Sequence, residues 1–157
     1  MSNKNTDVLR KARDYAFLLL KFRLRSEKEL YQRLKKKKFD EGIVRETIAF
    51  LKDKNFINDD VFAKVWMESR IKKPLGLIRL KQELKLKGID NDIIDRQIKE
   101  ISEGYSEEEI VSKITQDKFR KFKNIEPAKA KRRIYAYLLR RGFSPEAVID
   151  AINQVYQ

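Results

Sequence analysis

The spacing of apolar residues predicts helices along almost the whole chain. Apolar side chains recur three and four positions apart, as at Val8, Ala12, Tyr15 and Leu19. Glycine and proline number only 5 and 3, so long stretches are free of helix breakers. The chain shows no sustained period-2 alternation and no Asn-Gly or Asp-Gly turn, the usual signals of strands and hairpins. The sequence therefore predicts an all-α fold.

One block of residues occurs three times. It consists of an apolar residue near the end of a helix, a short turn, a capping residue and a new apolar stripe. The second and third copies are offset by 50 and 54 residues. The copies are Leu34-x4-Phe39-Asp40-x2-Ile43-Val44-x3-Ile48, Leu84-x4-Ile89-Asp90-x2-Ile93-Ile94-x3-Ile98 and Leu138-x4-Phe143-Ser144-x2-Ala147-Val148-x3-Ile152.

The turn inside each block predicts a helix end followed by a helix start. Gly88 and Gly142 stand just beyond a helix, where a positive φ favours glycine. The first copy has Lys38 at that position, so we expect its turn to be strained or slightly different. A capping residue then begins the next helix in each copy, namely Asp40, Asp90 and Ser144.

Further caps complete a three-helix unit. Ser26 with Glu29 and Ser106 with Glu109 predict capping boxes, and Asn58 predicts another N-cap. We expect nine helices at about 7–22, 26–37, 40–53, 58–72, 76–87, 90–102, 106–123, 127–141 and 144–156. They form three tandem three-helix repeats, at 1–56, 57–103 and 104–157. Because units of this size are marginal alone, we expect them to stack into an elongated, curved array.

The charge changes this picture because it follows the repeats. The chain has 37 basic and 24 acidic residues, a net charge of +13. Residues 21–38, 69–88 and 118–141 carry net charges of +7, +6 and +9, whereas 40–60 and 89–117 carry −3 and −6. A single lysine on a helix is usually just solvated. Three clusters in phase with the repeat indicate a basic face that binds a polyanion or an acidic protein surface.

The residue types present exclude several kinds of chemistry. Cysteine and histidine are absent, which excludes disulfides, Cys/His zinc sites and triads that need either residue. No Walker or dinucleotide-binding glycine motif occurs. Asp59-Asp60 could hold Mg²⁺ in a nuclease-like site, but both also suit the first turn of a helix capped by Asn58. We expect a protein that is not an enzyme and needs no metal or cofactor.

The apolar runs are too short to cross a membrane. None approaches the 18 or so residues required. The run at 15–20 follows charged residues and is not followed by the small residues of a signal-peptide cleavage site. We therefore expect a cytoplasmic protein.

Several motifs indicate a family. The middle repeat reads Asp59-Asp60-Val61-Phe62-Ala63-x2-Trp66-x2-Ser69-Arg70, then Gly76-x3-Leu80-x2-Glu83-Leu84-x2-Lys87-Gly88-Ile89. The first repeat carries Ala12-x2-Tyr15-Ala16 and Arg25-Ser26-x2-Glu29-Leu30-x2-Arg33-Leu34, and the third carries Tyr137-Leu138-x-Arg140-Arg141-Gly142-Phe143-Ser144. On these motifs, which span nearly the whole chain, the sequence resembles the RecX family of regulators of the RecA recombinase. Lys38 departs from the glycine that is usual there.

The resemblance implies a partner and an activity. It implies tandem three-helix repeats that bind, as a monomer, in the helical groove of the RecA filament on single-stranded DNA. Family members hinder filament extension or promote disassembly. They thereby inhibit the ATPase, strand-exchange and SOS coprotease activities of RecA, and they can also contact DNA directly.

Two sets of residues are assigned on this basis. One set is expected to maintain the fold: Ser26, Asp59, Phe62, Ala63, Trp66, Gly76, Leu84, Gly88 and Ile89. The other is expected to form the basic face that contacts RecA or DNA: Arg70, Lys72, Lys73, Arg79, Lys87, Arg132, Arg133, Arg140 and Arg141. Reversing Arg70, Lys72 and Lys73 to Glu is predicted to abolish inhibition and to leave helicity intact.

Two other functions stay open at this point. An independent basic DNA-binding module would bind DNA tightly without recombinase and with a steep salt dependence. A carboxylate-metal nuclease would show Mg²⁺-dependent cleavage that is lost when Asp59 and Asp60 are both replaced.

Overall fold

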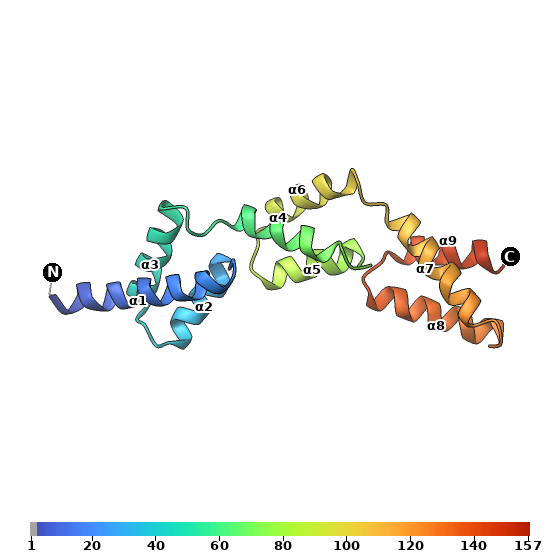
Figure 1. The fold of residues 1–157 in the computed structure, drawn as a ribbon, viewed down its shortest axis with the longest axis horizontal. Coiled ribbons are helices and arrows are strands. Elements are labelled where there is room, and N and C mark those ends of the chain that lie inside the picture. Colours follow the sequence, from blue (N-terminus) through green and yellow to red (C-terminus); the bar gives the residue numbers. More distant parts are fainter. Residues whose placement is uncertain (1–2) are drawn as a thin grey trace. The chain divides into compact units, whose positions relative to one another are not determined.

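The structure is a computed structural model that describes residues 3–157 (Figure 1). Every regular element in this range is a helix. The helices are α1 (Asn3–Phe22), α2 (Glu27–Lys36), α3 (Glu41–Asp53), α4 (Asp59–Arg70), α5 (Leu77–Leu86), α6 (Asn91–Ser102), α7 (Glu107–Lys121), α8 (Pro127–Arg140) and α9 (Pro145–Val155). The predicted all-α class and nine helices are confirmed for these residues, and each helix end lies within four residues of its prediction.

Side-chain caps explain where several helices begin. Ser26 accepts a hydrogen bond from the Glu29 amide, and Glu29 accepts one from the Ser26 amide, so the predicted capping box is present. Asn58 Oδ1 accepts from the next helix at 2.9 and 3.3 Å, and Ser144 caps α9. The prediction that the Asp40 side chain caps α3 is wrong. Asp40 occupies the N-cap position of α3, but its side chain makes no cap hydrogen bond.

The left-handed turn recurs in all three repeats. Gly88 and Gly142 have φ of 79° and 83°, as predicted. Lys38 has φ of 68°, so its turn has the same conformation rather than a different one. In each copy the amide after the turn donates to the carbonyl five positions earlier, at 3.3, 3.1 and 3.2 Å. The lysine therefore bears the steric strain of a left-handed residue within an unchanged turn.

The chain forms two compact units, and the middle repeat contributes to both. The first unit contains residues 3–66 with Leu84–Ile94, and the second contains Met67–Glu83 with Asp95–Gln157. In the first unit α1, α2 and α3 enclose a core that includes Ala16, Leu30 and Leu34. The elongated, curved stacking of the repeats stays a prediction.

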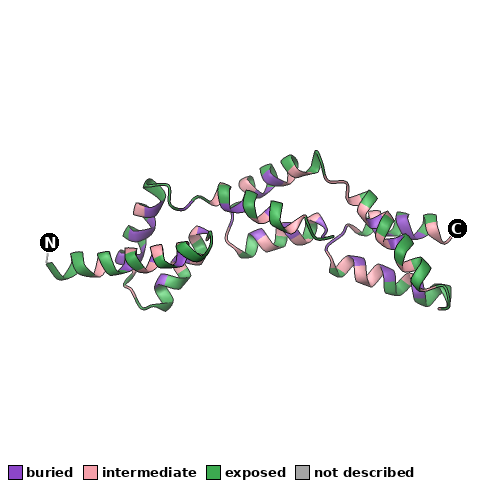
Figure 2. Ribbon diagram, viewed as in Figure 1, coloured by how far each residue is buried: buried purple, intermediate pink, exposed green. Residues whose placement is uncertain are grey.

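The second unit has its core between α7, α8 and α9. The residues buried there are Val111, Ile134, Leu138, Phe143, Val148, Ala151 and Ile152. In the middle repeat, Phe62, Ala63, Leu84 and Ile89 are buried. Figure 2 shows buried positions alternating with exposed ones along the helices, as the three-and-four spacing of apolar residues predicts. No helix within residues 3–157 has the length and apolar character needed to cross a membrane.

Candidate basic interface and inter-repeat junctions

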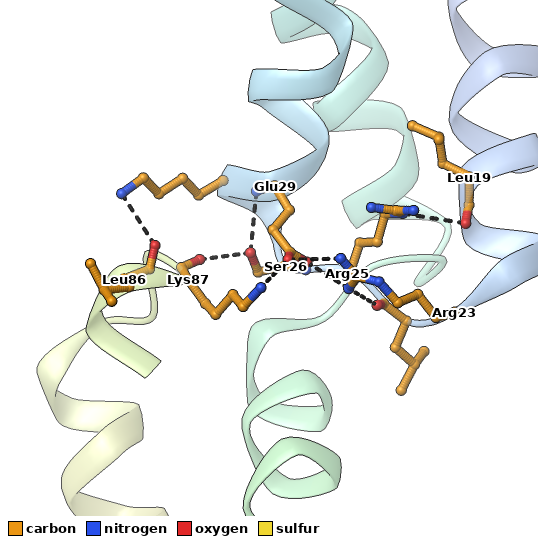
Figure 3. A network of polar contacts seen from close by, with 9 residues as sticks. Leu19, Arg23, Arg25, Ser26, Glu29, Leu86 and Lys87 are labelled. Atoms are coloured by element: carbon orange, nitrogen blue, oxygen red, sulfur yellow. Dashed lines mark hydrogen bonds and ion pairs between the residues drawn. The ribbon is translucent and has the colours of Figure 1, made fainter. Parts of the chain in front are cut away.

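The first repeat meets the middle repeat where α2 begins and α5 ends (Figure 3). Ser26 Oγ donates to the Lys87 carbonyl at 2.6 Å while it accepts the Glu29 amide at 3.2 Å. Lys87 Nζ forms an ion pair with Glu29 at 2.7 Å and lies 4.9 Å from the centre of the Trp66 ring. Arg23 adds two hydrogen bonds to the Glu29 carboxylate, at 3.0 and 3.1 Å. We call this contact the first junction.

Glu29 is the electrostatic centre of the first junction. Burial opposes its ionisation, but hydrogen bonds from Arg23, Lys87 and the Ser26 amide outweigh burial and lower its pKa to about 2. The carboxylate is thus ionised at neutral pH. Lys87 is thereby held at the end of α5 by a partner 58 residues away.

The second junction joins the middle and third repeats in the same manner. The Gly76 amide, just before α5, donates to the Arg141 carbonyl at 2.9 Å. Arg79 Nη1 donates to the Arg140 carbonyl at 3.4 Å, and Arg79 Nε pairs with Glu83 at 3.3 Å. In both junctions, therefore, the start of a second helix binds the turn between the second and third helices of the next repeat.

A half-buried carboxylate completes each junction. Asp59 accepts the amide of Glu27 at 2.9 Å, and Glu107 accepts the amide of Leu77 at 3.1 Å. Both amides belong to the first residue of a helix, where no intrahelical acceptor is available. Burial raises the pKa of both carboxyl groups, and the backbone hydrogen bonds only partly oppose it. Asp59 thus has a partner within the fold.

The junctions leave no room for side chains at their glycines. A Cβ added to Gly88 would lie 2.5 Å from the Cβ of Lys28. A Cβ on Gly142 would collide with the Cβ and backbone of Arg79, and one on Gly76 would collide with the Gly142 carbonyl. Close approach of two backbones, as well as positive φ, therefore requires glycine here.

Three of the nine predicted contact residues form ion pairs with carboxylates within the fold. Arg70 makes a two-pronged ion pair with Glu83, at 2.6 and 2.9 Å, and its side chain is 23% exposed. Arg79 shares Glu83, and Lys87 pairs with Glu29. Their role in binding a partner stays a prediction. Charge reversal at these positions would therefore disrupt an intramolecular ion pair as well as change the surface charge.

A concavity lined by several cations lies on the third repeat. A groove of about 570 Å³ runs between α7 and α8. We call it the α7–α8 groove. Five cations and no acidic residue line it, together with Phe122, Ala136 and Tyr137; the cations are Lys118, Lys129, Arg132, Arg133 and Arg140. Three of them belong to the predicted basic face, and they lie here on one helix.

Two cations lie against the ring of Tyr137, which lines this groove. Lys118 Nζ lies 3.8 Å from the centre of its ring, and the Arg141 guanidinium lies 5.3 Å from it. Lys118 also lies 5.8 Å from the Phe122 ring. Such cation–π contacts hold an ammonium group in place without neutralising its charge. The groove is therefore suited to anionic groups such as phosphates or carboxylates.

A second groove, of about 350 Å³, borders α7. Its other wall is the loop after α4, with Ile71, Lys72, Lys73 and Pro74, so we call it the loop groove. The residues of α7 that line this loop groove are Ile110, Lys113, Ile114 and Asp117. One face of α7, together with its C-cap residue, lines both grooves, because its members are spaced four residues apart: Ile110, Ile114, Lys118 and Phe122.

The structure thus brings together cations from two of the predicted clusters. Lys72 and Lys73 come from the middle repeat, whereas Arg132, Arg133 and Arg140 come from the third, and all lie beside α7. Sequence reasoning missed Lys113, Lys118 and Lys129. The signal for Lys118 and Lys129 was present, since both fall within the basic segment 118–141.

Comparison with known proteins identifies the family. Models of the first, second and third three-helix domains of RecX match residues 12–51, 58–96 and 106–152, in that order. The regulatory protein RecX of Haemophilus influenzae (strain PittEE) is 32% identical over 142 residues, which are 90% of this chain and 92% of that protein. The chain belongs to the RecX family.

Other RecX proteins extend the comparison. The regulatory protein RecX of Bacillus pumilus is 34% identical over 151 residues, which cover 96% of this chain and 57% of the relative. The crystal structure of RecX from Lactobacillus salivarius superposes with a TM-score of 0.81 at 22% identity, over 95% of this chain and 97% of that one. The fold is therefore that of RecX, and the relatives are named as regulatory proteins.

Proposed function

We propose that this protein is a negative regulator of the RecA recombinase. It acts as a cytoplasmic monomer that binds in the groove of the RecA–single-stranded-DNA filament and hinders extension or promotes disassembly. It thereby lowers ATPase, strand-exchange and SOS coprotease activity. The observation that carries this proposal is the ordered match of three RecX domains, from residue 12 to residue 152, with relatives named as regulators.

The mechanism we propose is steric and electrostatic, with no covalent step. The α7–α8 groove and the loop groove supply cations that stay in solvent or lie against aromatic rings. These cations meet acidic surface of the filament groove or the DNA backbone. Arg70, Arg79 and Lys87 maintain the repeats that present this surface, because Arg70 and Arg79 share an ion pair with Glu83 and Lys87 pairs with Glu29.

The test is the single-stranded-DNA-dependent ATPase of a bacterial RecA, titrated with this protein at two DNA concentrations. Loss of ATPase at substoichiometric protein, unaffected by added DNA, is the expected result. Inhibition that added DNA reverses would mean that the protein sequesters the strand. No inhibition of RecA from several bacteria would refute the proposal.

The α7–α8 groove favours a second candidate, an independent DNA-binding module. Five cations without an acid form a surface that attracts any phosphate backbone. For single strands the logarithm of affinity falls with the logarithm of salt concentration by about 0.7 per neutralised phosphate. Replacing Arg132 and Arg133 by Glu should reduce that slope by about 1.4 if each contacts one phosphate.

A control with the same charge change separates local contact from net charge. Lys64 and Lys99 are exposed on α4 and α6, outside both grooves. Reversing these two lysines gives the same net charge as reversing Arg132 and Arg133. Equal loss of oligonucleotide binding by both double variants, measured by fluorescence anisotropy without RecA, would exclude the groove as the DNA site.

A further inference from the structure

The two junctions follow one docking plan. In each, the first amide of a second helix binds a carboxylate from the first turn of the next repeat: Glu27 binds Asp59, and Leu77 binds Glu107. In each, the residue just before that helix donates to the carbonyl preceding the left-handed glycine. The accepting repeat therefore needs a glycine in the turn before its third helix and an acid in the first turn of its first helix. The docked second helix needs a first amide that is free to donate.

The first repeat has the turn but neither the glycine nor the acid. Lys38 occupies the place of Gly88 and Gly142 in the same left-handed conformation. At Gly88 and Gly142 a Cβ would collide with the Cβ of the docked Lys28 or Arg79, and Lys38 carries a Cβ at the equivalent position. The first turn of α1 contains no acidic residue. A helix cannot dock here as it does at the two junctions.

The third repeat has a second helix, α8, but this helix has no free first amide. Glu126 supplies its own carboxylate, which accepts the amides of Ala128 and Lys129 at 3.0 and 3.1 Å. Pro127 is the first residue of α8 and has no amide hydrogen to donate. The start of α8 is thus satisfied within its own repeat, in contrast to the starts of α2 and α5.

We propose that the turn at Lys38 and the start of α8 are the two halves of an unused junction, closed against a second copy of this chain. Docking of α8 on the first repeat of another copy would be head-to-tail, and a head-to-tail contact that does not close into a ring grows without limit. Lys38 closes the accepting half, and Glu126 with Pro127 closes the donating half. On this proposal, the strained left-handed lysine at position 38 prevents a second copy from docking.

One experiment asks whether lysine at this turn excludes a docked helix. Gly142→Lys places in the second junction the residue that the first repeat already accommodates at φ 68°. The Gly76 amide, which donates to Arg141, should lose its protection from hydrogen exchange. The Phe143 amide, which closes the turn inside the third repeat, should keep its protection as an internal check of folding. Retained protection at Gly76 would overturn the proposal.

A second experiment asks whether opening both halves allows copies to associate. The accepting half is opened by two changes, Lys38→Gly, which restores the glycine turn, and Asn3→Asp, which gives α1 an acid in its first turn. The double change Glu126→Ala, Pro127→Ala opens the donating half. Sedimentation velocity over a concentration series should find monomers for the unchanged chain and for each half-opened variant. The variant with all four changes should show a mean mass that rises with concentration. Association by a half-opened variant, or a fourfold variant that stays monomeric, would refute the closed junction.

Discussion

Replacing Lys38 by glycine should stabilise the first repeat, whereas replacing Gly142 by alanine should destabilise the third. Both residues lie in the same left-handed turn, at φ of 68° and 83°. A residue with a Cβ costs about 1–2 kcal/mol in that conformation. Glycine has more freedom in the unfolded chain, which offsets about 0.5–1 kcal/mol of the gain. Lys38→Gly should therefore stabilise by about 0.5–1 kcal/mol.

The change at Gly142 adds a packing cost to the conformational one. An alanine Cβ would overlap the Cβ and backbone of Arg79, so the second junction must open or shift. Overpacking of this kind costs about 1–3 kcal/mol, which brings the total to about 1.5–4 kcal/mol. Gly42→Ala is the control. It lies within α3 with nothing within 4 Å of the added Cβ, so it should stabilise by up to about 1 kcal/mol.

Native-state hydrogen exchange measures these effects where they arise. The Phe39 and Phe143 amides close the two turns, at 3.3 and 3.2 Å, and their protection reports local stability. Protection should rise at Phe39 in Lys38→Gly and fall at Phe143 in Gly142→Ala. Loss of protection at Phe39 in Lys38→Gly would show that the lysine side chain stabilises the turn, and the strain argument would then be wrong.

Three further outcomes follow from ion pairs and exposed lysines. The lowered pKa of Glu29 contributes stability that is complete above its ordinary value of 4.5 and is lost as pH falls toward 2, so Glu29→Gln should flatten the acid limb of stability measured by urea unfolding. Arg70→Glu should destabilise by facing Glu83 with a like charge, and adding Glu83→Arg should restore part of the loss in thermal melts. Reversing Lys72 and Lys73 alone should weaken RecA inhibition at unchanged circular dichroism; full inhibition would remove the loop groove from the interface.

Local chemistry made most of the fold predictable. Helix starts at Ser26, Asn58 and Ser144 depend on hydrogen bonds within four residues, so residue type and spacing suffice to locate them. The left-handed turns are equally local. Asp40 was mispredicted because occupying the cap position does not oblige a carboxylate to turn toward the helix. The turn at Lys38 shows that packing of the flanking helices can impose a conformation that the residue itself disfavours.

The candidate site was less predictable because its cations divide according to distant partners. Lys87 is paired with a carboxylate 58 residues away, and Arg79 reaches a carbonyl 61 residues away. No periodicity in the sequence distinguishes these residues from Arg132 or Arg133, which occur in an equally basic segment. The grooves likewise depend on which stripe of α7 faces its neighbours. That depends on tertiary packing, which composition does not report.

The division of the cations follows from the repeat itself. At each junction, the first turn of one helix contacts basic residues at the end of another helix. Where the first turn offers an acid, as Glu29 does to Lys87, the two form an ion pair within the junction. Where an arginine stands opposite instead, as Arg79 does near Arg141, one cation turns to Glu83 and the other to the Tyr137 ring beside the α7–α8 groove. The second junction therefore leaves Arg141 beside Tyr137, which lines the α7–α8 groove that we propose as a site for a polyanion.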